Sequence, residues 1–212
     1  MMTPSTASFF AALWQDFLQF APSAKRVHAL LGGGSPIVND HIALRTFNTP
    51  ELGLDALEPL ILSMGYRLGD SYQFTAKKLQ ARHYEHPQTT VPKIFISELL
   101  LEQFSAELQS TIAELLSQQA LSRPTELNFL HSGRHWELHH SQYQQLVRES
   151  EYAGWLAALG FRANHFTVSV NHLPSFSSVS EVNERLKAAG FVLNTAGGEI
   201  KGSPEVMLEQ SS

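Results

Sequence analysis

Histidine is the residue type in this chain most able to do chemistry, and it is unusually frequent. The 212 residues include 10 His and no Cys. Without Cys, the chain has no disulfide framework, thiolate zinc site, iron–sulfur cluster or Cys nucleophile. Any metal must therefore be held by imidazole and carboxylate groups. That donor mixture suits Fe, Mn, Co, Ni or Zn.

Two of the ten histidines are related by an internal repeat. The segment NDHIAL at 39–44 resembles ANHFTV at 163–168, which places His41 and His165 at corresponding positions with an offset of 124 residues. Each segment is followed by a predicted helix, a glycine and an aromatic residue. A similarity that continues through strand, helix and turn predicts two copies of one supersecondary unit. Packed side by side, the copies would point both histidines into the space between them, as a two-histidine metal site.

A third ligand is expected from the last predicted strand, at 205–210. Glu205 and Glu209 lie four residues apart there and so share a face of the strand. Glu209 follows the apolar run 206–208, whereas Glu205 adjoins Gly202-Ser203-Pro204, which is typical of a turn. We therefore favour Glu209 as the ligand and keep Glu205 as the alternative.

The strand predicted at 40–47 has two different faces. Its alternation puts His41, Ala43 and Arg45 on one face and apolar residues on the other. Arg45 lies four residues beyond His41 on the same face of that strand. An arginine there could bind a carboxylate with two hydrogen bonds, and the alternative is an internal ion pair with a core-facing glutamate.

Five further polar residues are candidates for supporting roles. Asp40 and Asn164 immediately precede the two histidines and form either strand-entry turns or contacts that hold the imidazole rings. His83 and Tyr84, on a predicted strand of the first copy, are candidate substrate contacts, with an exposed surface position as the alternative for His83. Lys93, on the next predicted strand, is a candidate lining residue for the same pocket.

A second histidine cluster competes with the repeated pair. His131, His135 and His139 are spaced four residues apart and would share one face of a helix, as zinc ligands can. However, Ser132-Gly133 interrupts that helix, and the sequence HWELH differs from HExxH because its glutamate is one place late. We expect a loop and a short strand here rather than a metal site.

The fold class follows from hydrophobic periodicity and glycine positions. With the repeat, these predict an α+β fold of two copies of a strand–helix–strand unit followed by further strands, packed around a central metal site, with added N-terminal and inter-module helices. The expected segments are N-terminal helices at 1–36, a first module at 37–97, a helical connection at 98–160 and a second module, complete or truncated, at 161–212. The predicted helices are 6–20, 24–31, 51–64, 98–120, 142–159 and 178–189. The predicted strands are 40–47, 66–74, 77–85, 93–97, 163–171, 191–193 and 205–210.

Composition and charge narrow the class of partner. Apolar residues make up 43% of the chain and charged residues 17%, which is typical of a folded soluble protein. The net charge of −5 and the absence of a basic run argue against nucleic acid and anionic membranes as partners. Neither a membrane-spanning apolar run nor a signal peptide is evident, so we expect a cytoplasmic protein.

Three motifs carry a resemblance to a known family. The residues HIALRTF at 41–47, SEYAGW at 150–155 and NHFTV at 164–168, in this order, resemble the 2-oxoadipate dioxygenase/decarboxylase family. That family belongs to the vicinal oxygen chelate superfamily, which also contains glyoxalases and extradiol dioxygenases. The resemblance covers residues 38–212 and implies the βαβββ module of that superfamily.

The resemblance implies both a reaction and a ligand set. The reaction is an Fe(II)-dependent conversion of 2-oxoadipate and O2 into 2-hydroxyglutarate and CO2, a step of lysine catabolism that uses no external cosubstrate. The metal ligands would be His41, His165 and Glu209, and Arg45 would bind the substrate carboxylate. The chain ends three residues after Glu209, where the family pattern leads us to expect more sequence. We therefore expect a truncated second module or a short branch, in which residues for the distal carboxylate are missing.

Two other functions are compatible with the same fold. A glyoxalase-type isomerase or lyase would use Zn, Ni or Co, with Glu205 or Glu209 as the base. A metal-free module would only bind a small molecule, and the repeated pair of His41 and His165 counts against it.

Overall fold

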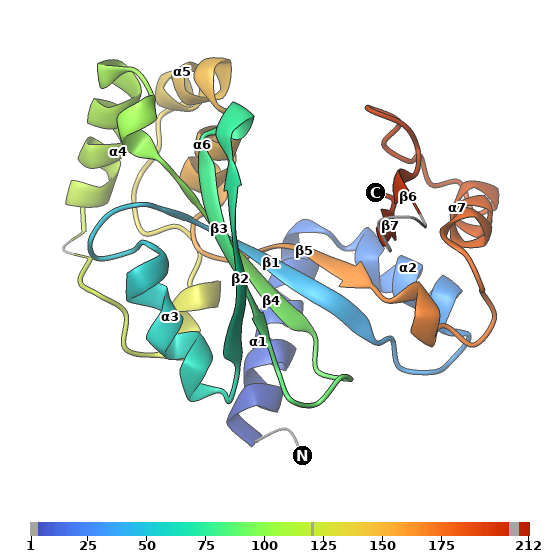
Figure 1. Cartoon of the computed structure of the whole chain (residues 1–212). Helices are drawn as coiled ribbons and strands as arrows, with labels where there is room; N and C mark the ends of the chain where they lie inside the picture. Colours follow the sequence, from blue (N-terminus) through green and yellow to red (C-terminus); the bar gives the residue numbers. More distant parts are fainter. Residues whose placement is uncertain (1–3, 120, 204–207) are drawn as a thin grey trace.

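A five-stranded mixed sheet organises the chain, and helices gather around it (Figure 1). The computed structural model describes residues 4–119, 121–203 and 208–212. The helices of these residues are α1 (Pro4–Phe20), α2 (Ser23–Gly32), α3 (Leu54–Ser63), α4 (Ala106–Ser117), α5 (His140–Glu149), α6 (Glu151–Leu159) and α7 (Val179–Ala188). The strands are β1 (Asn39–Phe47), β2 (Arg67–Phe74), β3 (Leu79–Glu85), β4 (Lys93–Leu99), β5 (Ala163–Val168), β6 (Lys201–Ser203) and β7 (Leu208–Gln210). An α+β fold is therefore confirmed.

The first half of the chain forms the predicted βαβββ module. Strand β1 is followed by α3 and then by β2, β3 and β4, and the strand order of the sheet is β2-β3-β4-β1-β5. Strand β1 pairs in parallel with β4 and antiparallel with β5. Because β5 comes from the second half of the chain, β1 and β5 join the two halves in one sheet.

The two faces of this sheet have different surroundings, as the alternation in β1 predicts. Ile42 and Leu44 point to the face covered by α1 and α3, where they are almost fully buried in the main apolar core. His41, Ala43 and Arg45 alternate with them and so point to the opposite face. Burial of apolar side chains on the first face stabilises the sheet, which leaves the second face available for polar groups.

The start of α3 is fastened to the sheet by a buried carboxylate. Glu98 of β4 accepts a hydrogen bond at 2.8 Å from the backbone N–H of Leu54, one of the free donors at a helix N-terminus. Gly53 precedes that helix, and a Cβ at this position would lie 2.9 Å from the Glu98 Oε2 atom. Glycine therefore allows the carboxylate to approach the helix end closely.

The predicted helix at 142–159 is in fact two helices, α5 and α6. Ser150 separates them with an extended backbone, and its side chain accepts a hydrogen bond from the N–H of Ala153. A serine in this position favours a new helix start over continuation of the old helix. Helices α4, α5 and α6 pack together at one end of the sheet (Figure 1).

The described residues of the second half form only part of a βαβββ module. Strand β5 and helix α7 follow the expected order, but the strand expected at 191–193 is absent and Val192 is 97% exposed. Strands β6 and β7 pair with each other in a separate hairpin and not with the five-stranded sheet. None of the described strands pairs with residues 191–193, so their sequence pattern alone does not produce a strand.

The N-terminal helices pack against the second half of the chain. On α1, Trp14 and Phe17 each have their ring centroid 5.0 Å from that of Phe166, on the apolar side of β5. Of the helices that the structure describes, none is both long and apolar enough to cross a bilayer. The cytoplasmic location remains a prediction.

Candidate metal centre and substrate cavity

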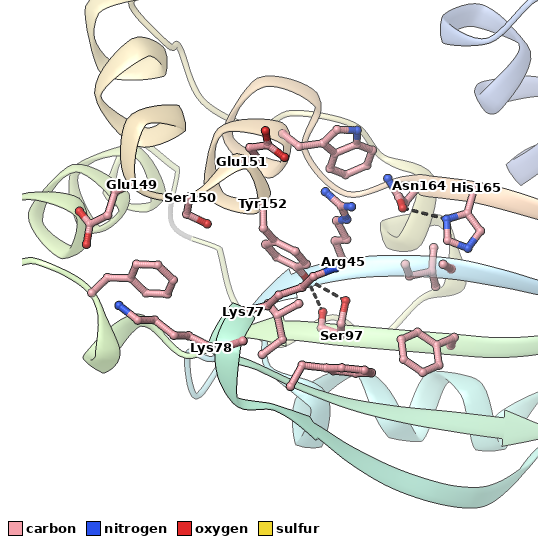
Figure 2. A pocket seen from close by; sticks show the side chains of 18 residues that line it. Arg45, Lys77, Lys78, Ser97, Glu149, Ser150, Glu151, Tyr152, Asn164 and His165 are labelled. Atoms are coloured by element: carbon pink, nitrogen blue, oxygen red, sulfur yellow. Dashed lines mark hydrogen bonds between the residues drawn. The ribbon is translucent and has the colours of Figure 1, made fainter. Parts of the chain in front are cut away.

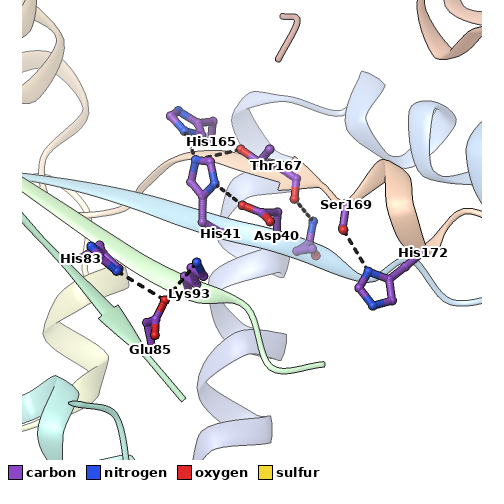
Figure 3. A network of polar contacts seen from close by, with 10 residues as sticks. Asp40, His41, His83, Glu85, Lys93, His165, Thr167, Ser169 and His172 are labelled. Carbon is purple, nitrogen blue, oxygen red and sulfur yellow. Dashed lines mark hydrogen bonds and ion pairs between the residues drawn. The ribbon is translucent and has the colours of Figure 1, made fainter. Parts of the chain in front are cut away.

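The structure brings His41 and His165 together on the open face of the sheet (Figure 3). In the β1–β5 pair, His41 lies opposite Thr167 and Ala43 lies opposite His165. In the repeat, His41 corresponds to His165 and Ala43 corresponds to Thr167. Each histidine therefore lies opposite the residue two places beyond the other histidine, and the two strands pair symmetrically. As a result, the two Nε2 atoms lie 3.4 Å apart.

Each imidazole is held by the residue that precedes it. Asp40 Oδ2 lies 2.9 Å from His41 Nδ1, and Asn164 Oδ1 lies 2.9 Å from His165 Nδ1. An oxygen acceptor at Nδ1 favours the tautomer with the proton on Nδ1, which leaves a lone pair on Nε2. Of the two roles considered for Asp40 and Asn164, contact with the rings is the one observed.

The electrostatics of the pair favour a cation. With the protons on Nδ1, both Nε2 atoms would carry a lone pair 3.4 Å from the other, and these repel unless a positive charge lies near both. Loss of hydration, with the nearby His41 and Arg45, lowers the pKa of His165 to about 4, so this ring is neutral at pH 7. Neutral imidazole is the form that binds a metal. The pair therefore fits two neighbouring ligands of one divalent ion.

The third ligand is not assembled with the two histidines. Glu209 lies on β7 with an exposed side chain, and Glu205 lies outside the described residues. Within the ranges that the structure describes, no three His, Asp or Glu side chains are close enough together to hold one metal ion. Glu209 does, however, line a cavity of about 570 Å³ that is also lined by His165 and Arg45.

Arg45 lies near His165, between the aromatic rings of Tyr152 and Trp155, which we call the aromatic clamp (Figure 2). Its Cζ atom lies 4.7 Å from the ring centroid of Tyr152 and 4.8 Å from that of Trp155, both on α6. Burial lowers its pKa, although the guanidinium remains charged at any physiological pH. No carboxylate of the described residues forms an ion pair with Arg45, so the predicted alternative of an internal ion pair is not found.

The clamp is fixed to the sheet by the Tyr152 hydroxyl. This group donates to the carbonyl oxygen of Ser97 at 2.6 Å and accepts from the N–H of Thr46 at 3.2 Å. The ring therefore contacts the backbone of both β1 and β4. A charged arginine held by two aromatic faces has its donors free for an anion that enters from outside.

The clamp opens into a cavity of about 630 Å³. Arg45, Asn164 and His165 line both this cavity and the one that contains Glu209, so the metal candidate and the clamp meet where the two cavities adjoin. Lys77 also lines the larger cavity, and none of the described residues forms an ion pair with it. The remaining lining is mainly aromatic and aliphatic and includes Phe74, Leu79, Phe95, Phe104, Tyr152 and Trp155. It also contains three charged residues, Lys78, Glu149 and Glu151.

Two of the predicted substrate contacts lie elsewhere. Tyr84 is fully buried on the apolar face of the sheet, and its hydroxyl donates to Glu58 of α3 at 3.0 Å. His83 is on the open face, but its Nδ1 accepts from the N–H of Asp70 at 3.1 Å and it does not line the cavity. Their places on adjacent positions of one strand explain why they point in opposite directions. The geometry therefore does not support substrate contact for either residue.

Lys93 lies beside the histidine pair but outside the cavity. It is half exposed on β4 and forms an ion pair at 3.0 Å with Glu85 (Figure 3). Its register partner on β1 is His41, so its charge lies near the metal candidate. The expectation that Lys93 lines the pocket is not supported.

The competing histidine cluster is spread over a loop. Gly133 has a φ of +76° and forms a bridge to Phe161, which interrupts any helix through this segment. His135 Nε2 forms a hydrogen bond of 2.6 Å with the hydroxyl of Ser132. His139 is the N-cap residue of α5. These side chains serve local structure.

Sequence reasoning missed three residues of the site: Lys77, Tyr152 and Trp155. The two aromatic residues are spaced three apart on a helix, and that spacing predicts that both lie on one face. Their partner, Arg45, is more than 100 positions away, and periodicity gives no sign of such contacts. Lys77 follows an exposed strand and has no sequence signal of its own.

The chain matches a known family over most of its length. It matches the family described as 2-oxoadipate dioxygenase/decarboxylase over residues 20–137 and 127–212. The chain belongs to this family. The resemblance of the three motifs is thereby confirmed.

Individual members of the 2-oxoadipate dioxygenase/decarboxylase family support this result. The chloroplastic enzyme of that name from Arabidopsis thaliana is 35% identical over 187 residues, which are 82% of this chain and 50% of that protein. The chain thus spans about half the length of the curated relatives it matches.

Two solved structures show the same fold over nearly the whole chain. One is the hydroxyglutarate synthase of Oryza sativa in complex with 2-oxoadipate, with a TM-score of 0.89 and 32% identity over 99% of this chain and 73% of that one. The other is a protein of Shewanella frigidimarina NCIMB 400 for which a hydrolase activity has been suggested. Its TM-score is 0.94 and its identity 54%, over 100% of this chain and 83% of that one.

Proposed function

We propose that this chain is an Fe(II)-dependent dioxygenase/decarboxylase that converts 2-oxoadipate and O2 into 2-hydroxyglutarate and CO2. The observation that carries the proposal is the juxtaposition of the His41–His165 pair with the clamped, unpaired Arg45. Membership of the family and similarity to a structure bound to 2-oxoadipate support the same substrate. We place the reaction in lysine catabolism because the family resemblance implies it.

The metal would be held by His41 and His165 through their Nε2 atoms. As the third ligand we propose Glu209, which lines the cavity that His165 also lines. Bound iron(II) would supply polarisation of the 2-oxo group and activation of O2. Two neutral imidazoles and one carboxylate suit iron(II) and leave other coordination positions open.

Arg45 would bind and orient the substrate through a carboxylate. Its planar guanidinium can donate two parallel hydrogen bonds, and the rings of Tyr152 and Trp155 restrict its orientation. Because the site is partly shielded from water, this attraction is stronger than it would be on the surface. Arg45 thus fixes which end of the substrate faces the histidines.

Lys77 is our candidate for the second carboxylate of a dicarboxylic substrate. It lines the same cavity as Arg45 and has no ion-pair partner in the described part of the chain. The turn that carries it is pinned, because the adjacent Lys78 has a left-handed backbone with φ of +55° and donates to the Gln103 carbonyl at 2.6 Å. Arg45 and Lys77 could each bind one carboxylate of such an acid, with its carbon chain against the aromatic and aliphatic residues of the lining.

The proposed reaction balances without a further reductant. The bond between the carboxylate carbon and the 2-oxo carbon breaks, and CO2 leaves. One atom of O2 completes the new carboxylate at the former 2-oxo carbon. The other is inserted into a C–H bond of the adjacent carbon, where it becomes the hydroxyl of 2-hydroxyglutarate. The substrate supplies all the electrons that O2 takes up. The protein therefore needs to bind one organic acid and O2, and no second organic substrate.

Oxygen uptake by the iron(II)-loaded chain tests the proposal. We expect 2-oxoadipate to drive O2 consumption with equal amounts of CO2 and 2-hydroxyglutarate formed, and the zinc-loaded protein to be inactive. Glu209→Gln should lower iron affinity, whereas the nearby Gln210→Glu serves as a control for altered charge. If the folded, iron-loaded protein consumes no O2 with any 2-oxo acid, the proposal is wrong.

A further inference from the structure

Two residues outside the proposed ligand set hold the histidines in a matched way. Asp40 and Asn164 each present a side-chain oxygen 2.9 Å from Nδ1 of the following histidine. They occupy the same position in the repeat, since the offset of 124 residues that relates His41 to His165 also relates Asp40 to Asn164. The matched contacts therefore belong to the duplicated unit and recur in both of its copies.

We propose that Asp40 and Asn164 are positioning residues, which set the tautomers of His41 and His165 so that both Nε2 lone pairs face one metal ion. This inference rests on the proposed function for its metal. With Nδ1–H donated to oxygen, Nε2 has only a lone pair to offer, and the 3.4 Å separation of the Nε2 atoms suits two ligands of one ion.

A second contact agrees with this assignment. The Thr167 hydroxyl lies 3.1 Å from His41 Nε2, where it can donate to that lone pair. In the metal-free chain, Asp40 at Nδ1 and the Thr167 hydroxyl at Nε2 give the His41 ring a partner at each nitrogen, and a bound metal would take the place of the hydroxyl at Nε2 (Figure 3).

Asp40 carries a negative charge and Asn164 is neutral, so the two histidines should differ in how strongly they donate to the metal. A carboxylate at Nδ1 increases the electron density of an imidazole more than a neutral amide does. His41, with Asp40, should therefore be the stronger donor to the metal, and His165, with Asn164, the weaker one. The repeat thus gives equal geometry with unequal donor strength.

The tautomers can be measured in the metal-free protein. Nitrogen-15 NMR of the imidazole rings near pH 8, where histidine is neutral, distinguishes Nδ1–H from Nε2–H. We expect Nδ1–H for both rings in the native chain. Asp40→Ala should shift His41, and Asn164→Ala should shift His165, toward Nε2–H, each without a change in the other ring.

Metal affinity gives the second readout. Asp40→Ala or Asn164→Ala should weaken binding of Co²⁺ about 10–100-fold. Asp40→Asn should restore most of the binding lost in Asp40→Ala, and Asn164→Asp should bind more tightly than the native chain. Circular dichroism and the unfolding midpoint show which variants remain folded. Co²⁺ affinities are compared only among the folded variants.

The outcomes separate this inference from the proposed function. If the alanine variants are folded and keep both the native tautomers and the native Co²⁺ affinity, the positioning role is wrong. The tautomer measurement needs neither metal nor substrate, so a native chain without oxygenase activity would contradict the proposed function alone.

Discussion

The Nε2 atoms of His41 and His165 lie 3.4 Å apart because the strands that carry them pair in a register that the repeat offset leaves unchanged. Each histidine sits on a strand and is flanked by the other copy. The geometry of the pair is therefore set by the hydrogen bonds between the two strands, and paired strands hold side chains more rigidly than loops do. A duplicated strand thus provides two ligands at equivalent positions.

Loss of either histidine should remove metal binding without unfolding the chain. For His41→Ala and His165→Ala, we expect Co²⁺ affinity to fall by more than about 100-fold, since changes at residues behind the ligands already cost 10–100-fold. Titration with Co²⁺ measures this. His135→Ala, which alters a histidine in the loop cluster, is the control, and an equal loss there would place the metal elsewhere.

The Tyr152 hydroxyl should matter for substrate binding beyond its effect on stability. Tyr152→Phe removes the bonds to Ser97 and Thr46, which should free the clamp around Arg45 and raise KM. The matched control is Tyr84→Phe, which also deletes a buried tyrosine hydroxyl but lies in the core against Glu58. Both variants should lose about 0.5–1.5 kcal/mol of stability. Only the first should change KM, and equal KM values would contradict the clamp.

Lys77 should discriminate between substrates with one and two carboxylates. For Lys77→Met, we expect kcat/KM for 2-oxoadipate to fall about 10–100-fold, since a hydrogen bond to a charged group contributes about 1.5–3 kcal/mol. The value for a 2-oxo monocarboxylic acid of equal length should be unchanged. Exposed Lys25→Met is the control for net charge. A uniform loss with both acids would argue against a distal-carboxylate contact.

Glu98, which is buried against the N-terminus of α3, should make the free energy of unfolding depend on pH. Burial raises its pKa above the ordinary glutamate value of 4.5, so the folded chain binds this proton more tightly than the unfolded chain. Its contribution to stability is then fully present below pH 4.5 and is lost as pH rises through the raised pKa.

Urea unfolding at a series of pH values tests this dependence. Glu98→Gln keeps an acceptor for the Leu54 N–H but has no titrating proton. Relative to this variant, the native chain should become less stable from pH 4.5 toward neutrality. Exposed Glu51→Gln should give a profile parallel to the native one. Parallel profiles for native Glu98 and Glu98→Gln would refute the assignment.

The sequence contains enough information for the first module and for the histidine pair. The alternation in 40–47 correctly separates Ile42 and Leu44 from His41 and Arg45, because one face of the sheet is buried and the other is not. The repeat identifies His165 because both copies meet in one sheet. These features depend on local pattern and on internal similarity, both of which a single sequence shows.

Other features depend on contacts that local pattern does not encode. Tyr84 is in a strand with a clear alternation, but which face is the core is decided by where α3 packs. The break at Ser150 depends on a side-chain cap within a segment whose periodicity is helical throughout. The strand expected at 191–193 needs a neighbour, and the sheet does not supply one. In each case the tertiary environment overrides the local preference.

The hydrogen bond from the Thr46 N–H to the Tyr152 hydroxyl gives the clamp its own internal reporter. Most amides in a strand are protected from deuterium exchange by a neighbouring strand, so their rates report on opening of the sheet. This amide is instead protected by a side chain of α6. Its exchange rate therefore measures how often the helix lifts from the sheet, and a bound acid that tightens Arg45 between its two rings would slow that rate at a single backbone position.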